Sequence, residues 1–133
     1  MPAAIVAEQT ITVGQPVVIE GMASNSTFGA VFEDDGTTGY FYGLDMTKTE
    51  QPIVDARHIY DVEDVTDRSI PSVIQIAWSL DGLKTVLIIN KYPHAVIDFV
   101  GRRAYCRTSF PPPDSTWSAH DVAWDDQALE LFR

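Results

Sequence analysis

Short apolar runs separated by turn residues make up most of the chain, and this pattern predicts antiparallel β structure. In the first half we expect strands at residues 17–20, 28–33, 40–45 and 53–62. The second and third of these strands should pair with each other, because the stretch between them carries two glycines and is typical of a turn. In the strand at 53–62, alternation would place His58 and Tyr60 on the same face.

The centre of the chain predicts a meander with strands at residues 73–79, 84–90, 94–100 and 102–108. Asp81 and Gly82 join the first two of these strands, and Asp-Gly between apolar strands is a strong signal for a tight hairpin turn. Residues 85–90 are apolar without alternation. We therefore expect this strand to lie in the middle of a sheet with both faces covered.

The last part of the chain predicts a change from sheet to helix. Three prolines at residues 111–113 stiffen the chain as polyproline II and end the sheet. Residues 125–132 open with two aspartates and carry apolar residues on one side, which predicts a C-terminal α-helix. The sequence thus predicts an α+β fold, mainly antiparallel sheet with this helix packed on it, in a single domain over residues 1–133.

Net charge is the strongest global feature. With 9 Lys and Arg against 19 Asp and Glu, the chain carries a formal charge of −10. Such a field repels nucleic acids and anionic membranes and attracts a basic protein. Acidity that serves only solubility is the simpler explanation. We expect no nucleic-acid or membrane partner, and a basic protein remains the partner that the charge favours.

Three features of the sequence bear on the cellular compartment of the protein. The longest apolar runs, such as residues 86–89, are too short to cross a bilayer. The first ten residues lack the basic and apolar regions of a secretory signal. The lone Cys106 cannot form an internal disulfide, which fits a reducing compartment. We therefore expect a cytoplasmic protein, and the sequence leaves the oligomeric state open, a homodimer included.

The acidic run Glu33, Asp34 and Asp35 before Gly36 raises the question of a metal or phosphate site. Consecutive acids on a strand point to opposite faces, and no closing Glu completes a calcium loop. The turn has no Lys and opens a strand, so it does not match a phosphate-binding loop. A hairpin turn, in which Asp35 bonds to the backbone, is the simplest explanation. The alternative is that Asp34 and Asp35 also bind a partner.

Several stretches resemble a bacterial family known as domain of unknown function 2251. They are FEDDGTTGYFYGLD at residues 32–45, HIYDV at 58–62, AWSLDG at 77–82, LIINKYPHAVIDF at 87–99, CRTSFP at 106–111 and AWDDQALELF at 123–132. The resemblance covers nearly the whole chain. It implies a bacterial single-domain protein, and it transfers no catalytic residue.

Histidines and the cysteine are the first candidates for chemistry. His94 and Asp98 share a strand face but stand about 13 Å apart, too far for a direct pair. His94 with Cys106 would be a base and a nucleophile, although no local signature supports this pair. His58, His94 and His120 are too scattered in the sequence to resemble a metal motif, so we expect no metal and no cofactor.

Arginines and tyrosines are the candidates for binding. Arg103 and Arg107 would share a strand face and could hold an anion, although pairing with Asp98 or with the acidic turn is the simpler role. Phe41 should enter the core, so Tyr40 and Tyr42 should point away from it and are candidates for a protein-binding surface, although half-buried amphipathic tyrosines are the simpler explanation.

Together these features predict a non-catalytic protein-binding module, with toxin neutralisation of the immunity type as one form of it. Its binding residues would be Asp34, Asp35, Tyr40, Tyr42, His94, Arg103 and Arg107. The alternative is a small enzyme or small-molecule-binding protein whose site lies near His94, Arg103 and Cys106.

Overall fold

Two β-sheets form the structure, a computed structural model that describes residues 3–101, 103–106 and 120–123. The four-stranded sheet has the order β2-β3-β4-β5. Its strands are β2 (Val17–Met22), β3 (Phe28–Asp34), β4 (Thr38–Asp45) and β5 (Ile53–Asp61). A turn of 3₁₀-helix, η1 (Val62–Asp64), follows β5.

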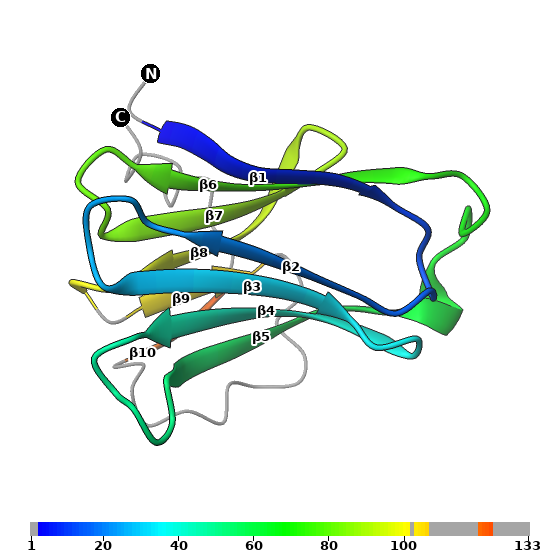
Figure 1. Cartoon of the computed structure of the whole chain (residues 1–133). Helices are drawn as coiled ribbons and strands as arrows, with labels where there is room; N and C mark the ends of the chain where they lie inside the picture. The colour runs from blue at the N-terminus through cyan, green and yellow to red at the C-terminus, as the bar shows by residue number, and fades with distance from the viewer. Residues whose placement is uncertain (1–2, 102, 107–119, 124–133) are drawn as a thin grey trace.

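The second sheet has six strands in the order β1-β6-β7-β8-β9-β10. Its strands are β1 (Ala3–Ile11), β6 (Ser72–Ser79), β7 (Lys84–Ile89), β8 (Tyr92–Asp98), β9 (Arg103–Cys106) and β10 (His120–Ala123). Figure 1 shows β8, β9 and β10 lying behind the four-stranded sheet, so that the two sheets form the layers of a β-sandwich.

Most of the predicted strands are confirmed, and the described residues are mainly antiparallel sheet. The hairpin of β3 and β4 and the meander from β6 to β9 both form with antiparallel pairing. The pairing of β9 with β10 is parallel, and neither β1 nor β10 was predicted. The first strand was missed because its alanines and polar residues have low β propensity.

The predicted C-terminal helix at residues 125–132 lies outside the described residues, as do the three prolines at 111–113. Among the residues that the structure describes, η1 is the helical segment and no α-helix occurs. The helical part of the predicted α+β fold is therefore unsupported, and the described fold is a β-sandwich.

The two sheets share one apolar core. It contains side chains from both layers, such as Phe32 of β3 and Leu87 of β7, each 0% exposed. Alternation along the strands turns these side chains toward the facing sheet. In β7 the consecutive residues Thr85, Val86 and Leu87 are all buried, which confirms that this strand lies mid-sheet with both faces covered.

Large aromatic side chains fill one end of the core. The ring of Phe99 stacks on Phe28 with centroids 4.3 Å apart and on Trp78 with centroids 5.6 Å apart. The indole N–H of Trp78 donates to the backbone oxygen of Gly21 at 3.0 Å. Because Trp78 belongs to β6 and Gly21 to β2, this bond joins the two sheets and satisfies a buried donor.

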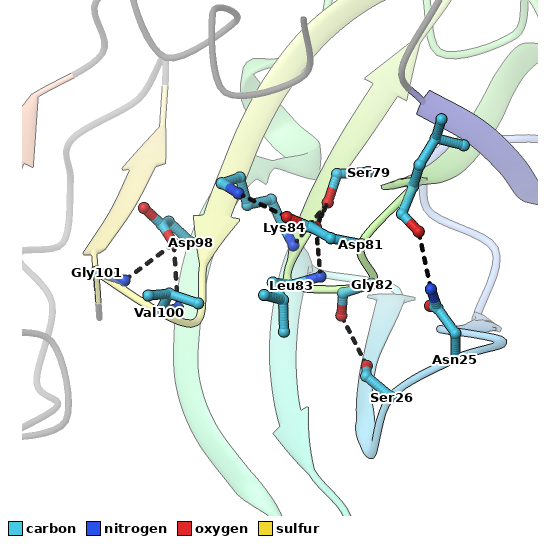
Figure 2. Close-up of polar contacts among 11 residues, drawn as sticks. Asn25, Ser26, Ser79, Asp81, Gly82, Leu83, Lys84, Asp98, Val100 and Gly101 are labelled. Carbon is cyan, nitrogen blue, oxygen red and sulfur yellow. Dashed lines mark hydrogen bonds and ion pairs between the residues drawn. The ribbon is translucent and has the colours of Figure 1, made fainter.

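Polar contacts close the same end of the sandwich, and Figure 2 shows them around the β6–β7 turn. The predicted Asp81-Gly82 turn is confirmed, with Gly82 at a positive φ of 71°. The Ser26 hydroxyl donates to the backbone oxygen of Gly82 at 2.7 Å, and the Asn25 amide donates to that of Leu80 at 2.8 Å. The β2–β3 loop of one sheet is thereby bound to the hairpin of the other.

Replacing Gly82 with Val should lower the free energy of unfolding by more than about 1 kcal/mol, because a β-branched residue resists positive φ. A Cβ at this position would also collide with the Asn25 side chain. Urea denaturation measures the change. Thr37→Val, at an exposed turn position without positive φ, is the control and should shift stability by less than about 0.5 kcal/mol. Equal effects of the two substitutions would contradict the assignment of strain to Gly82.

Candidate functional site on the four-stranded sheet

Asp34, the central residue of the acidic run, lies on the inner face of the four-stranded sheet and is 0% exposed. Its carboxylate accepts three hydrogen bonds. The backbone N–H groups of Gly14 and Gly36 donate to it at 2.8 Å each, and the hydroxyl of Tyr60 donates at 2.7 Å. The prediction that Asp34 is a surface binding residue is therefore corrected, because its carboxylate is a buried structural acceptor.

A β-bulge in β5 brings Tyr60 to this position. Gly39 pairs with Tyr60 and Tyr40 pairs with His58, so Ile59 is the extra residue. Ile59 and Tyr60 both pack on the core, while the ring of His58 contacts Tyr40 on the other face. The predicted alternation, which placed His58 and Tyr60 on one face, is wrong for this reason.

Gly39 provides the room that the Tyr60 ring needs. A Cβ at Gly39 would stand 2.6 Å from the nearest atom of this ring, so no other residue fits without displacing it. The ring also contacts Phe32, with centroids 6.2 Å apart. Gly39 of β4 and Tyr60 of the bulge therefore fit together on the inner face of the sheet.

Asp35 is the turn residue that the sequence predicts. Its Oδ1 accepts from the backbone N–H groups of Thr37 at 2.9 Å and Thr38 at 2.8 Å. These bonds, the one from Thr38 first, hold the pKa of Asp35 below its usual value. The side chain is exposed, so a charged carboxylate stands beside the outer face of the sheet.

Tyr40 and Tyr42 form the centre of that outer face. Their rings lie 5.9 Å apart and nearly parallel, at 14°. The Tyr42 hydroxyl donates to Glu33 Oε1 at 3.2 Å, and the edge of His58 contacts Tyr40 at 5.4 Å between centroids. Both tyrosines are partly exposed and Phe41 between them is fully buried, as predicted. Tyr40, Tyr42 and His58 thus form one group of contacting rings, which we call the aromatic platform.

Carboxylates surround the aromatic platform. Glu33 lies across from Tyr40 in the strand register, and Asp61 Oδ1 is 2.9 Å from His58 Nε2. Glu20 adds a further exposed carboxylate on β2. The basic residue within β2 to β5 is Arg57, which is buried on the inner face and paired with Asp55 at 3.1 Å. Within these four strands the outer face therefore exposes no Lys or Arg, and its carboxylates and aromatic rings lie beside the exposed apolar side chains of Val18 and Met22.

The other predicted site residues do not gather with this face or with one another. His94 lies at the start of β8 and lines a cavity between the sheets. Arg103 pairs in the backbone register with Asp98 at the other end of β8, so His94 and Arg103 are not neighbours. Cys106 pairs with Ala95, and Arg107 lies outside the described residues.

Neither a metal-binding cluster nor a membrane-spanning helix is found in the part of the chain that the structure describes. Within residues 3–101, 103–106 and 120–123, no group of three or more His, Cys, Asp or Glu side chains is placed to hold a metal ion. The same residues contain no helix that is long and apolar enough to span a bilayer.

Comparison with known proteins gives the family of the chain. Residues 11–133 match the family described as "Uncharacterized protein conserved in bacteria (DUF2251)". The chain belongs to this family. It is also 42% identical over 97 residues to an uncharacterised protein of Haemophilus influenzae, covering 71% of this chain and 60% of that relative. No solved structure shows a significant match.

Membership in the DUF2251 family confirms the resemblance read from the sequence. The matched region contains the whole four-stranded sheet and begins at the last residue of β1. Glu33, Asp61 and His58, which sequence reasoning did not group with the tyrosines, lie within it. Their grouping depends on strand register and on the bulge, and the sequence carries no local signal for either.

In this DUF2251 protein, Asp34→Asn should destabilise far more than Asp35→Asn. A carboxamide has one acceptor oxygen, so a buried donor of Gly14, Gly36 or Tyr60 would lose its partner at a cost of about 1–3 kcal/mol. Asp35 receives both of its backbone bonds on Oδ1, which Asn reproduces, and only the long, exposed contact of 3.3 Å from the Thr38 hydroxyl reaches Oδ2, so we expect a change below about 1 kcal/mol. Urea denaturation of both variants gives the comparison. Equal, small effects would show that Asp34 is not the structural acceptor.

Tyr42 offers a titration test of the platform. Partial burial first, and the charge of Glu33 second, raise the pKa of Tyr42 from 10.0 to about 12. Because folding raises the pKa of Tyr42, the protonated phenol stabilises the folded protein. This stabilisation is complete below pH 10.0 and is lost as the pH rises through about 12. The difference in tyrosinate absorbance between wild type and Tyr42→Phe should show one phenol titrating near that value. Glu33→Gln should move it to lower pH, and a difference curve centred at 10 in the wild type would contradict the geometry.

Proposed function

We propose that this protein is a non-catalytic binding module that holds a basic partner protein on the outer face of its four-stranded sheet. The observation that supports the proposal most directly is the aromatic platform bordered by carboxylates, on a face whose four strands expose no Lys or Arg. Tyrosines that are already stacked lose little conformational freedom when a partner binds, which is why they dominate the binding energy of many interfaces.

The chemistry of the face favours an arginine or lysine side chain of the partner. A cation over the ring of Tyr40 or Tyr42 would be attracted by the π-electrons. The Glu33 carboxylate accepts one bond from Tyr42 and has further lone pairs for a guanidinium or ammonium group. A basic group placed here would therefore meet an aromatic surface and a carboxylate together.

The net charge of −10 supports the same partner class through the rate of encounter. Long-range attraction speeds the association of oppositely charged proteins and orients them before contact. A toxin with a basic, nuclease-like cleft would be such a partner, so we extend the proposal to toxin neutralisation of the immunity type. Asp34 takes no part in this contact, because its side chain faces the core.

Affinity capture with the wild-type protein as bait, followed by binding kinetics on the captured partner, tests the proposal. The association rate should fall at least about tenfold as the Debye length shortens from about 8 Å at 0.15 M salt to about 3 Å at 1 M salt. Tyr40→Ala should weaken binding by about 2 kcal/mol or more if the ring is central to the contact. Glu33→Lys should slow association further.

Glu8→Lys is the matched control, because it makes the same charge change on β1 of the other sheet. It should change the association rate less than Glu33→Lys does. A partner whose association rate does not change with salt, or that binds Tyr40→Ala as well as wild type, would refute the proposed face. If Glu33→Lys and Glu8→Lys slow association equally, the partner is attracted by the net charge of the protein and not by the outer face of the four-stranded sheet.

A further inference from the structure

A cavity lies between the two sheets at the end of the sandwich that carries η1 and the β1–β2 connection (Figure 1). Its volume is about 460 Å³, which falls within the range of small-molecule sites in proteins. Four isoleucines form its walls, and each comes from a different strand: Ile11 of β1, Ile59 of β5, Ile74 of β6 and Ile89 of β7. Both sheets therefore contribute to one apolar space.

The composition of the core explains why space remains here. The opposite end is filled by the stacked rings of Phe28, Phe99 and Trp78. The cavity end is walled mainly by branched aliphatic side chains, which are shorter than the aromatic rings of the opposite end. An apolar molecule in this space would gain dispersion contacts with the side chains that line it and would bury their remaining apolar surface.

The polar side chains that line the cavity are those of Tyr60, Ser72, Asn90, Tyr92 and His94. The lining residues that the structure describes include no Asp, Glu, Lys or Arg. In a chain of net charge −10 this is an unusual neutral region. A charged ligand would lose hydration here without gaining an opposite charge, whereas a neutral one would not.

Asn90, an exposed residue in the turn between β7 and β8, brings a fixed amide group to the margin of the cavity. Its Oδ1 accepts from the backbone N–H of Val73 at 2.9 Å, which fixes the orientation of the amide. Its Nδ2 donates to the Ser72 hydroxyl over a long 3.5 Å, and the amide nitrogen carries two hydrogens. One fixed donor beside apolar walls is the pattern of a site for a mostly apolar molecule with a single polar group.

We propose that this cavity binds a neutral, largely apolar small molecule that carries one hydrogen-bond acceptor, which Asn90 receives. The site is separate from the partner-binding face, because the cavity lies between the sheets and the aromatic platform lies on the outer side of one of them. The bulge in β5 contributes to both, with Ile59 directed to the cavity and His58 to the platform.

Titration with N-phenyl-1-naphthylamine, a neutral apolar dye that fluoresces in apolar surroundings, tests the cavity directly. The wild-type chain should bind it saturably and with one-to-one stoichiometry. Ile89→Phe and Val13→Phe enlarge two lining residues, and each should weaken dye binding at least tenfold. Val100→Phe is the matched control, since Val100 is 66% exposed in the β8–β9 connection and does not line the cavity, and its dye affinity should equal that of wild type.

Backbone amide chemical shifts of the wild-type protein provide the second measurement, which does not depend on the folding of any variant. Addition of the dye should shift the amides of Ile11, Ile59, Ile74 and Ile89 and leave those of Tyr40 and Tyr42 in place. The proposal is overturned by non-saturable binding, by an affinity that both filling variants retain, or by shifts that map to the outer face. Tyr40→Ala should leave the dye affinity unchanged, because Tyr40 does not line the cavity. The cavity proposal is thereby tested separately from the proposed partner-binding face.

Discussion

The hydrogen bonds of the Asp34 carboxylate hold together parts of the chain that are distant in sequence. Gly14 lies in the connection from β1 to β2, Gly36 in the β3–β4 turn, and Tyr60 in the bulge of β5. Because β1 and β2 belong to different sheets, the bond from Gly14 also ties the two layers at this end. A buried carboxylate is costly unless its lone pairs are satisfied, so these segments must come together for the charge to be tolerated.

The orientation of the proposed binding face follows from the same residue. On a strand, an inward Asp34 requires that Glu33 and Asp35 point outward. Across the hairpin, the register then places Tyr40 opposite Glu33 and Phe41 opposite Phe32. The acidic and aromatic surface and the apolar core are therefore two consequences of one register. A slip by one residue would exchange them, burying Glu33 and exposing Phe32.

The two ends of the sandwich are stabilised in different ways. At one end, stacked aromatic rings pack in the core, and hydrogen bonds from Asn25 and Ser26 join the β2–β3 loop to the β6–β7 hairpin. At the other end, the sheets are tied by the Asp34 bonds, while the isoleucines around the cavity leave space between them. The same two sheets thus have one end packed with aromatic rings and another end that contains a cavity. The β5 bulge separates the proposed cavity site from the proposed partner face.

Local patterns in the sequence determined most of the strands, the Asp81-Gly82 and Asp35-Gly36 turns and the outward direction of Tyr40 and Tyr42, because turn chemistry and period-two alternation act between near neighbours. Tertiary structure decided what depends on distant residues. Asp34 is buried because Gly14 and Tyr60 meet it, which no local pattern indicates. His58 and Asp61 join the tyrosines through a bulge that breaks alternation, and the cavity beside His94 is formed by side chains from two sheets. Sequence periodicity specifies the faces of one strand, whereas register, bulges and layer spacing depend on which strands pair and how the sheets pack.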